Sequence, residues 1–280
     1  MTPNINDTGL DETVISPTLI HKSLSAADYN PTHEAMLART LERIALKKEH
    51  GLRTPDELWI VDHNDVYTLG QAGKEEHILR YTDTPIIKTD RGGQVTWHGH
   101  GQLVLYWLFD LQSLGWSVRH LVSHAEQALE DVLNECLSHS SLSNNSAIQA
   151  RARREAPGVY LYSQYNEVNK NDISHSNISP DTHPIMLGKI ASLGFKIKHG
   201  FSYHGLALNI NCDLSAFNAI NPCGYAGMQM LRLADFISLN ETDDNPNSSL
   251  CRYDHITQML IDNIAKRHTG ALQLRALDSK

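Results

Sequence analysis

The uninterrupted apolar run from Leu103 to Phe109 constrains the fold of this chain more than any other feature, because its seven residues include no charge. Its length is that of a β-strand and falls far short of the ~20 apolar residues of a membrane-spanning helix. Successive side chains of a strand point to opposite faces, and here the odd-numbered and the even-numbered side chains are both apolar. The run therefore predicts a central strand in a sheet that is covered on both faces.

The segment Pro31–His50 has the spacing and the end signals of a helix. Asn30 suits the N-cap, a proline suits the first helical position, and Gly51 suits the C-terminal end. The side chains that we expect on one face are Leu37, Leu41, Ile44 and, closing the stripe with a polar group, Lys48.

Two more helices are predicted, from Ser117 to Leu137 and from about Ile256 to Gly270. Their inner stripes are Leu121, Ala125, Leu129 and Val132 or Leu133 in the former, and Ile256, Met259, Leu260 and Ile264 in the latter. Further strands are expected at Leu58–Asp62, Asp65–Leu69, Pro85–Lys88, Gly158–Tyr162, Lys189–Ile197 and Phe201–Asn211, with a tight connection at His63-Asn64. Strands and helices intermix without regular βα alternation, so the predicted fold class is α+β: a single domain with a mixed β-sheet flanked by helices.

The composition is that of a folded chain, since 41% of its 280 residues are hydrophobic and 20% are charged. We expect one domain at 18–270, an N-terminal tail at 1–17 and a C-terminal tail at 271–280. Two polar stretches, Ser138–Ser146 and Ser163–Pro184, indicate surface loops, and the second predicts a loop insertion at about 163–187.

The charge balance argues against a nucleic-acid partner, because 24 Lys and Arg face 32 Asp and Glu, a net charge of -8. Two local basic groups, Arg151–Arg154 and Lys196–His199, either dock an acidic protein or belong to a solvated surface. The first twenty residues lack Lys, Arg and a sustained apolar core, so we expect neither a secretory signal nor a membrane partner. Four cysteines in a chain this long do not make a disulfide framework, which favours a reducing, cytoplasmic location.

The segment Asp90–Gln102 holds four glycines and leads directly into the apolar strand. Such a loop either brings its backbone close to a ligand or forms a glycine-rich hairpin, and it has the residue order of neither a Walker loop nor a dinucleotide fingerprint. A zinc site would recruit its ligands from His98, His100, His204 and Cys223, but their spacing matches no usual zinc motif, and we expect no metal.

Two residues stand out as reactive groups. Lys189 begins an apolar strand between glycines and is either drawn inward or exposed at a strand edge. Cys223 lies in a tight turn between a proline and a glycine, where a nucleophile would protrude, although a structural cysteine is the alternative. Cys212 is the rival nucleophile, and Cys136 and Cys251 are expected to be structural.

Several of these stretches, in this order over about residues 18–240, resemble the lipoyl(octanoyl) transferases, also called lipoate–protein ligase B. The matching stretches are Arg91-Gly-Gly-Gln-Val-Thr-Trp-His98, Gly101-Gln-Leu-Val-Leu-Tyr106, Ala156-Pro-Gly-Val-Tyr160, Lys189-Ile-Ala-Ser-Leu-Gly194, Tyr203-His-Gly-Leu-Ala-Leu-Asn209 and Asn221-Pro-Cys-Gly-Tyr-Ala-Gly227, together with Pro55–Trp59 and Thr68–Gly73. The chain departs from the family at His100, where proline is common, and in a longer stretch before Lys189.

The resemblance implies the α+β fold of biotin and lipoate ligases and the transfer of an octanoyl group through a cysteine thioester, the first step of protein lipoylation. It implies octanoyl-acyl carrier protein as donor and, as acceptors, lipoyl domains of 2-oxoacid dehydrogenase E2 subunits and the glycine cleavage H protein. No cofactor and no ATP are implied, because one thioester replaces another.

By motif, Cys223 is the nucleophile and Lys189 its partner, which would favour the thiolate and serve both half-reactions. The residues that the resemblance places in substrate binding are Arg91, Gly92, Gly93, Gln94, Val95, Thr96, Trp97, His98, Ser192, Leu193, Gly194, Gly205, Leu206 and Ala207. Trp97, Leu193 and Leu206 are the expected walls of an apolar acyl slot, and backbone N–H groups near Gly224 or in Ser192–Gly194 would hold the oxyanion.

Two alternatives remain at this point. One is an ATP-dependent lipoate or biotin ligase on the same scaffold, against which the cysteine argues because an acyl-adenylate needs no thiol. The other is a non-catalytic module that binds lipoyl domains or acyl groups.

Overall fold

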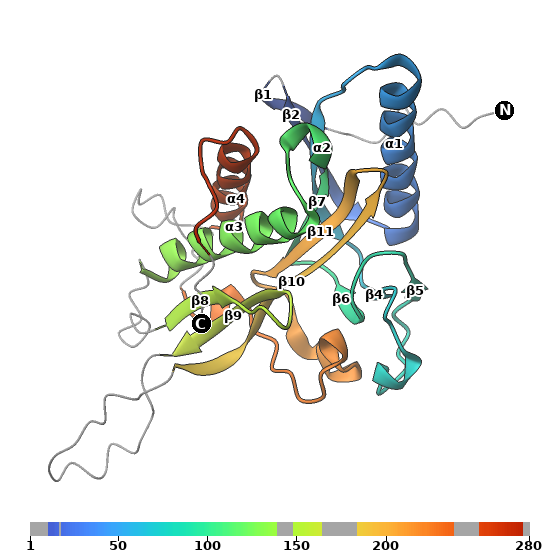
Figure 1. Ribbon diagram of the computed structural model, residues 1–280. Helices are drawn as coiled ribbons and strands as arrows, with labels where there is room; N and C mark the ends of the chain where they lie inside the picture. Colours follow the sequence, from blue (N-terminus) through green and yellow to red (C-terminus); the bar gives the residue numbers. More distant parts are fainter. Residues whose placement is uncertain (1–10, 17, 139–147, 164–183, 238–251, 277–280) are drawn as a thin grey trace, which may run out of the picture.

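The computed structural model describes residues 11–16, 18–138, 148–163, 184–237 and 252–276 (Figure 1). A large mixed sheet holds eight strands in the spatial order β1 (Asp11–Ser16), β2 (Leu19–Ala27), β3 (Asp56–His63), β7 (Gln102–Leu108), β11 (Phe201–Asn209), β10 (Ile185–Lys198), β9 (Gly158–Ser163) and β8 (Ile148–Ala152). A small sheet holds β5 (Ile86–Lys88), β4 (Val66–Leu69) and β6 (Val95–His98). The pairs β2–β3 and β4–β5 are parallel and the other pairs are antiparallel, so the predicted mixed sheet is confirmed.

The helices cover both faces of the large sheet. They are α1 (Tyr29–His50), α2 (Leu111–Leu114), α3 (Val118–Ser138) and α4 (Tyr253–His268), with short 3₁₀ turns η1 (Glu75–His77), η3 (Leu214–Ala219), η4 (Pro222–Gly224) and η5 (Leu233–Asp235). Helices α3 and α4 lie together on one face, and α1 lies on the other (Figure 1). Among the described residues, no helix has both the length and the apolar character to cross a bilayer.

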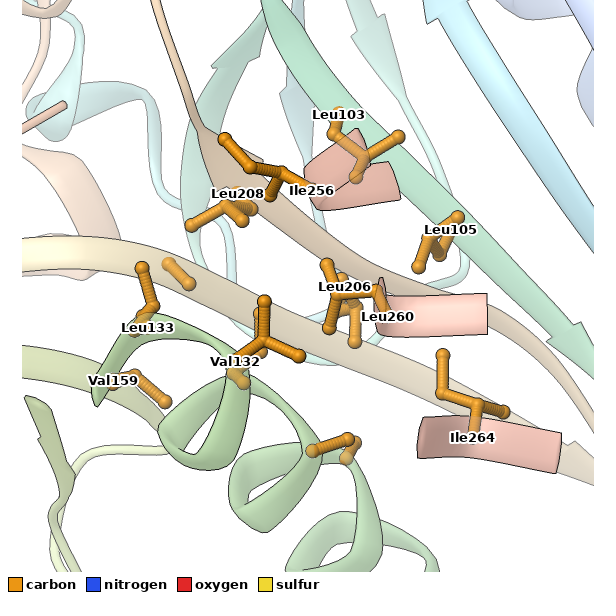
Figure 2. Packing of buried hydrophobic residues seen from close by; sticks show 14 of the residues in the cluster. Leu103, Leu105, Val132, Leu133, Val159, Leu206, Leu208, Ile256, Leu260 and Ile264 are labelled. Atoms are coloured by element: carbon orange, nitrogen blue, oxygen red, sulfur yellow. The ribbon is translucent and has the colours of Figure 1, made fainter. Parts of the chain in front are cut away.

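Strand β7 is the central strand that its apolar run predicts, between β3 and β11 and buried along its whole length. Its odd-numbered side chains join the core under α3 and α4, and its even-numbered side chains join the core under α1. Figure 2 shows part of the first core, where residues of β7 and β11 meet residues of α3 and α4: Leu103, Leu105, Leu206, Leu208, Val132, Leu133, Ile256, Leu260 and Ile264. The prediction from alternation is confirmed on both faces.

The predicted stripe of α3 is confirmed, since Leu121, Ala125 and Leu129 are fully buried. The predicted stripe of α1 is right for Ile44, which is buried, and for Leu37, which packs against the core under this helix, but it is wrong for Leu41. Leu41 is 42% exposed, and the buried residues of that helix include Met36, Thr40 and Arg43.

The end signals of α1 are right at one end only. Gly51 takes the left-handed conformation expected of a C-terminal glycine, with φ 66°. The N-cap position is Asp28 and not Asn30, because the helix begins two residues earlier than Pro31. A proline is tolerated anywhere in the first turn, so it did not fix the start.

Other boundaries differ from the sequence-based expectations. β1 lies inside the segment predicted as a tail, because its backbone pairs with β2. β3 and β4 follow each other through the predicted tight connection but belong to different sheets, and β6 pairs with β4, so the glycine-rich segment is not a hairpin with β7. β2, β6 and β8 were not predicted as strands.

The predicted loops fall largely outside the described residues, which exclude 139–147 and 164–183. The last residues of the expected insertion belong to β10, which begins at Ile185. Arg275, in the predicted C-terminal tail, forms ion pairs with Glu130 at 2.8 Å and with Asp131, both on α3.

A buried ion pair explains why α1 turns a charged side chain inward. The Arg43 guanidinium pairs with the carboxylate of Asp56 on β3 at 2.5 Å and donates to the carbonyl of Leu108 on β7, and both ionic side chains are 1% exposed. Asp56 also accepts from the backbone N–H of Asp110 at 2.8 Å and bonds to His268 of α4 at 2.8 Å. This network ties α1 and α4 to the central strands.

We predict that Arg43→Ala lowers the free energy of unfolding by about 3 to 5 kcal/mol, because the buried carboxylate of Asp56 loses its cation. Urea unfolding followed by circular dichroism measures the loss. Lys88→Ala, which removes an exposed pair with Glu75, is the control and should cost far less. Equal losses in the two variants would contradict the prediction.

Candidate active site

A cavity of about 320 Å³ lies where β10 and β11 meet the glycine-rich loop before β6 and the turn η4. Most of the residues that the sequence predicts for the site line it: Arg91, Gly92, Gly93, Gln94, Val95, Thr96, His98, Lys189, Ser192, Leu193, Gly194, Gly205, Leu206 and Cys223. The structure thus brings together segments that lie more than 130 positions apart in the chain, from Arg91 to Cys223.

Two predicted residues lie elsewhere. The ring of Trp97 packs edge-on against Phe217 at 5.6 Å, in the core beneath the small sheet. Ala207 belongs to the core under α1. Neither residue is among those that line this cavity, although their neighbours His98 and Leu206 are.

Lys189 and Cys223 meet at this cavity. The Lys189 Nζ lies 3.0 Å from the Cys223 Sγ and also donates to the carbonyl of Pro157 at 2.9 Å. Lys189 is 2% exposed, and its ammonium lies 5.3 Å from the centre of the Tyr160 ring. A partly exposed thiol therefore faces a buried amine whose position is fixed by two other groups.

The local backbone explains the position of the thiol. Cys223 has φ 57°, a left-handed conformation that is strained for a residue with a side chain, and it lies within a tight turn that Pro222 begins. After the turn, the segment from Gln229 to Leu231 runs beside β10. There the Lys189 N–H donates to the Gln229 carbonyl, and the Lys189 carbonyl accepts from the Leu231 N–H, both at 2.8 Å. The cysteine turn and the lysine strand are therefore held together by main-chain hydrogen bonds.

Gly158 makes room for the lysine side chain. A Cβ atom at this position would lie 2.5 Å from the Lys189 Cε and 2.9 Å from its Nζ. Gly158 also has φ 137°, which side chains rarely adopt. The close approach explains why the sequence has glycine directly after Pro157.

Lys189 provides a cation beside the Cys223 sulfur. Burial lowers the pKa of Lys189, but the facing sulfur of Cys223 and the Tyr160 ring outweigh that effect, and the pKa of the ammonium is raised. Arg91 is a second cation at the cavity. Burial lowers its pKa, and its guanidinium donates to the carbonyls of Thr68 at 2.6 Å and Gln94 at 2.7 Å.

Glu126 of α3 bonds to the backbone segment that holds Lys189, and the sequence analysis did not identify it. Its carboxylate accepts from the Gly158 N–H at 3.1 Å, next to the Pro157 carbonyl that holds Lys189. Burial raises the pKa of Glu126 to about 7, more than the bond from Gly158 lowers it. The available signal was a carboxylate directly after Ala125 on the predicted inner stripe of the helix.

An aromatic and histidine-rich wall closes the other end of the cavity, and it includes Tyr29 and Tyr106, which were not predicted. Burial lowers the pKa of His98 to about 3, so this imidazole is neutral near pH 7, and its Nδ1 bonds to Gln102 at 2.7 Å. His63 bonds to the Tyr106 hydroxyl at 2.7 Å behind this wall.

A group of His33, Asp90 and His204 has nitrogen and oxygen atoms within 4.8 Å of one another, a spacing that suits a metal ion. Asp90 bonds to the Nε2 atom of His204 at 2.9 Å and to that of His33 at 3.1 Å, so its carboxylate already links the two imidazoles. Hydrogen bonds with His204, Tyr203 and His33 hold the pKa of Asp90 far below its usual range, although partial burial opposes this effect. His100 lies outside the cavity and bonds to Asp62, so the zinc ligand set weighed from the sequence does not assemble.

The other cysteines differ sharply from Cys223. Cys212 is 1% exposed, and burial raises the pKa of its thiol to about 12. Cys136 is buried in α3, and Cys251 lies outside the described residues. The burial of Cys212 therefore argues against it as the alternative nucleophile.

Comparison with known proteins finds a matching family and relatives that share one name. Residues 34–247 match the family described as the lipoyl protein ligase A/B catalytic domain. The chain is 67% identical over 275 residues to the octanoyltransferase of Psychrobacter arcticus, covering 95% of this chain and 96% of that one. It is 44% identical over 231 residues to the octanoyltransferase of Acinetobacter baylyi, covering 81% and 86%.

Solved structures share the fold at low sequence identity. P. falciparum LipL1 in complex with lipoate gives a TM-score of 0.54 at 10% identity, covering 95% of this chain and 64% of that one. Lipoate-protein ligase A bound with ATP gives 0.51 at 13% identity, covering 91% and 86%. The fold predicted from the sequence is confirmed.

We predict that Lys189→Ala slows alkylation of Cys223 by iodoacetamide near neutral pH by roughly tenfold, because the thiolate loses the ammonium beside it. Peptide mass spectrometry after timed quenching measures the rate at this cysteine. Lys198→Ala, an exposed lysine at the end of the same strand, is the control and should alkylate at the wild-type rate. A Lys189→Ala rate within about twofold of wild type would remove the proposed role of the amine.

We also predict that Glu126→Gln stabilises the fold increasingly as the pH rises. The folded-state pKa of about 7 lies above the ordinary 4.5, so the native state binds more protons than the unfolded state between these values. Wild-type stability therefore falls across this window by up to about 3 kcal/mol, and the glutamine variant avoids that loss while keeping an acceptor for Gly158.

Urea unfolding at several pH values between about 5 and 8 tests this sign. Glu135→Gln, an exposed change on the same helix, should leave the pH dependence unaltered. A pH dependence in Glu126→Gln equal to that of wild type would show that this carboxyl does not titrate in the window.

Proposed function

This chain belongs to the lipoyl protein ligase A/B catalytic domain family and is an octanoyltransferase of protein lipoylation, and we propose that it carries the octanoyl group on Cys223. The observation that carries the proposal is the 3.0 Å approach of the Lys189 Nζ to the Cys223 Sγ at the wall of a cavity with apolar lining. A thiol paired with an amine is an activated nucleophile that suits acyl transfer between a thioester and an amine.

In the first half-reaction the Cys223 thiolate attacks the thioester carbonyl of the donor. A new carbon–sulfur bond forms and the donor's carbon–sulfur bond breaks. The departing thiolate takes a proton from the Lys189 ammonium, which leaves the lysine as a neutral amine. One thioester has replaced another, so the step consumes no ATP.

In the second half-reaction a neutral lysine amine of the acceptor protein attacks the acyl-enzyme carbonyl. The amide bond forms, the bond to the Cys223 sulfur breaks, and the neutral Lys189 amine takes the proton that the attacking nitrogen loses. The thiolate and ammonium are both restored. Lys189 thus acts as acid and then as base, and the kinetics are ping-pong.

The oxyanion of each tetrahedral intermediate needs a donor, and Leu193 supplies one in this proposal. Pairing of β10 with β9 ends at Ser192 opposite Gly158, and the Phe195 carbonyl further along accepts from Gly92 at 3.1 Å. Alternation along the strand directs the Leu193 N–H to the same side as that carbonyl, toward the cavity. The Gly224 N–H, the other sequence-based candidate, already donates to the Asn221 carbonyl at 3.0 Å.

The acyl chain requires an apolar slot, and the cavity provides one. Leu193 and Leu206 line it as predicted, and Val118, Val122 and Ile197 add apolar surface that the sequence analysis did not assign. The neutral state of His98 keeps that part of the wall uncharged near pH 7.

The proposed donor is octanoyl-acyl carrier protein. The proposed acceptors are lysines of lipoyl domains, in 2-oxoacid dehydrogenase E2 subunits and in the glycine cleavage H protein. ATP-dependent ligation occurs on a similar fold, as in the ATP-bound lipoate-protein ligase A, but an acyl-adenylate gives no role to a cysteine paired with a buried lysine.

We predict that Cys223→Ser abolishes a stable acyl-enzyme. Incubation of the wild-type protein with octanoyl-acyl carrier protein, without ATP, should increase its intact mass by one octanoyl group, and hydroxylamine should remove that group as expected of a thioester. Cys212→Ser is the matched control and should acylate like wild type, because that thiol is buried. An adduct that persists in Cys223→Ser would transfer the role to another residue.

A further inference from the structure

A second hollow of about 1400 Å³ lies between α3 and the edge strand β8. It adjoins the active-site cavity, because Val118, Val122 and Pro157 line both. Pro157 is the residue whose carbonyl holds Lys189, so the hollow opens beside the reactive pair.

Five arginines line this hollow, and one of them, Arg275, pairs with Glu130 and Asp131. The other four are Arg119, Arg151, Arg153 and Arg154. Arg151 and Arg154 are exposed, and Arg153 is half-buried over the Tyr160 ring at 5.4 Å. Within the described residues none of the four forms an ion pair with a carboxylate. Their charges are therefore available to a partner. We call this surface the arginine groove.

The carboxylates that also line the groove are already occupied. Asp131 pairs with Arg267 at 2.5 Å, and Glu130 pairs with Arg275 at 2.8 Å. Glu126 accepts from Gly158 beneath the active site. Glu155, next to the arginines, adds a single exposed negative charge at the mouth of the cavity. The wall nearest the reactive pair thus presents net positive charge.

We propose that the arginine groove is the docking site of the acyl donor, an acidic carrier protein that presents its thioester on a phosphodiester-linked arm. The inference rests on the proposed function and adds the surface that this partner occupies. A chain of net charge -8 repels an acidic partner at long range, so productive encounter requires a local cationic surface at the entrance to the site.

The donor fits this groove better than the acceptor does. A carrier arm is long and has a phosphate partway along it, so it needs a channel that leads to the thiol and cations along that channel. The groove meets both requirements, since it merges with the cavity at Val118, Val122 and Pro157 and its arginines lie along it. An acceptor lysine reaches the thiol on its own side chain and needs no anion-binding channel.

The test compares two double variants of equal charge change. Arg151→Glu/Arg154→Glu reverses the groove, and Arg53→Glu/Lys198→Glu reverses two exposed cations that line neither the groove nor the cavity. Acylation of Cys223 is timed by rapid quench and intact mass spectrometry with two donors, octanoyl-acyl carrier protein and octanoyl-pantetheine, which lacks both phosphate and protein.

The groove variant should acylate from the carrier protein at least about tenfold more slowly at low ionic strength, and from octanoyl-pantetheine within about twofold of wild type. Added salt should slow the wild type with the carrier and leave the groove variant nearly unchanged. The control variant should behave like wild type with both donors.

Three outcomes would overturn the docking proposal: equal loss in the two double variants, equal loss with the two donors, or a loss confined to transfer from the acyl-enzyme to a lipoyl domain. The last outcome would assign the groove to the acceptor. Failure of the proposed function is distinguishable from all three, because wild-type Cys223 would then acylate with neither donor.

Discussion

The site depends on a buried cation that the fold must compensate. Burying an ammonium is costly unless partners surround it, and Lys189 has the Cys223 sulfur at 3.0 Å, the Pro157 carbonyl at 2.9 Å and the Tyr160 ring beside it. Each partner is fixed by backbone structure: the sulfur by a left-handed turn, and the carbonyl by the segment at which Glu126 holds Gly158. The reactive pair is therefore a consequence of strand pairing and of one turn, and it does not depend on flexible side chains finding each other.

Local patterns in the sequence predicted the parts of the fold that depend on local patterns. The alternation in β7 determined its central place, because apolar groups on both faces require cover on both faces. The helical spacing in α3 and α4 determined their inner faces in the same way. Resemblance to a family's motifs identified the segments of the site. That these segments meet in space follows from the order of the strands around β11 and β10.

Features that depend on partners far away in the chain could not be predicted. Arg43 faces inward because Asp56 and the Leu108 carbonyl receive it, and no periodicity rule favours an arginine over Leu41. β1 is polar and short, and it is a strand because β2 offers an edge. Nothing in the helical pattern distinguishes Glu126 from an ordinary helix residue, and its place in the site follows from its bond to Gly158. A motif is a run of neighbours in sequence, so it included Trp97, whose ring packs in the core beneath the small sheet and does not line the cavity.

The functional features gather where sheet pairing stops. Beyond Ser192 and Gly158, no strand among the described residues pairs with β10 on its β9 side, and that gap leaves room for the glycine-rich loop, whose Gly92 donates to Phe195. A sheet edge that is open for a few residues offers backbone N–H groups to a ligand, as a fully paired strand does not. The same edge ends at the turn between β8 and β9, so the arginines of that turn border the entrance to the site. Oxyanion donor, acyl slot and cationic entrance are thus proposed as three consequences of one interruption in the sheet.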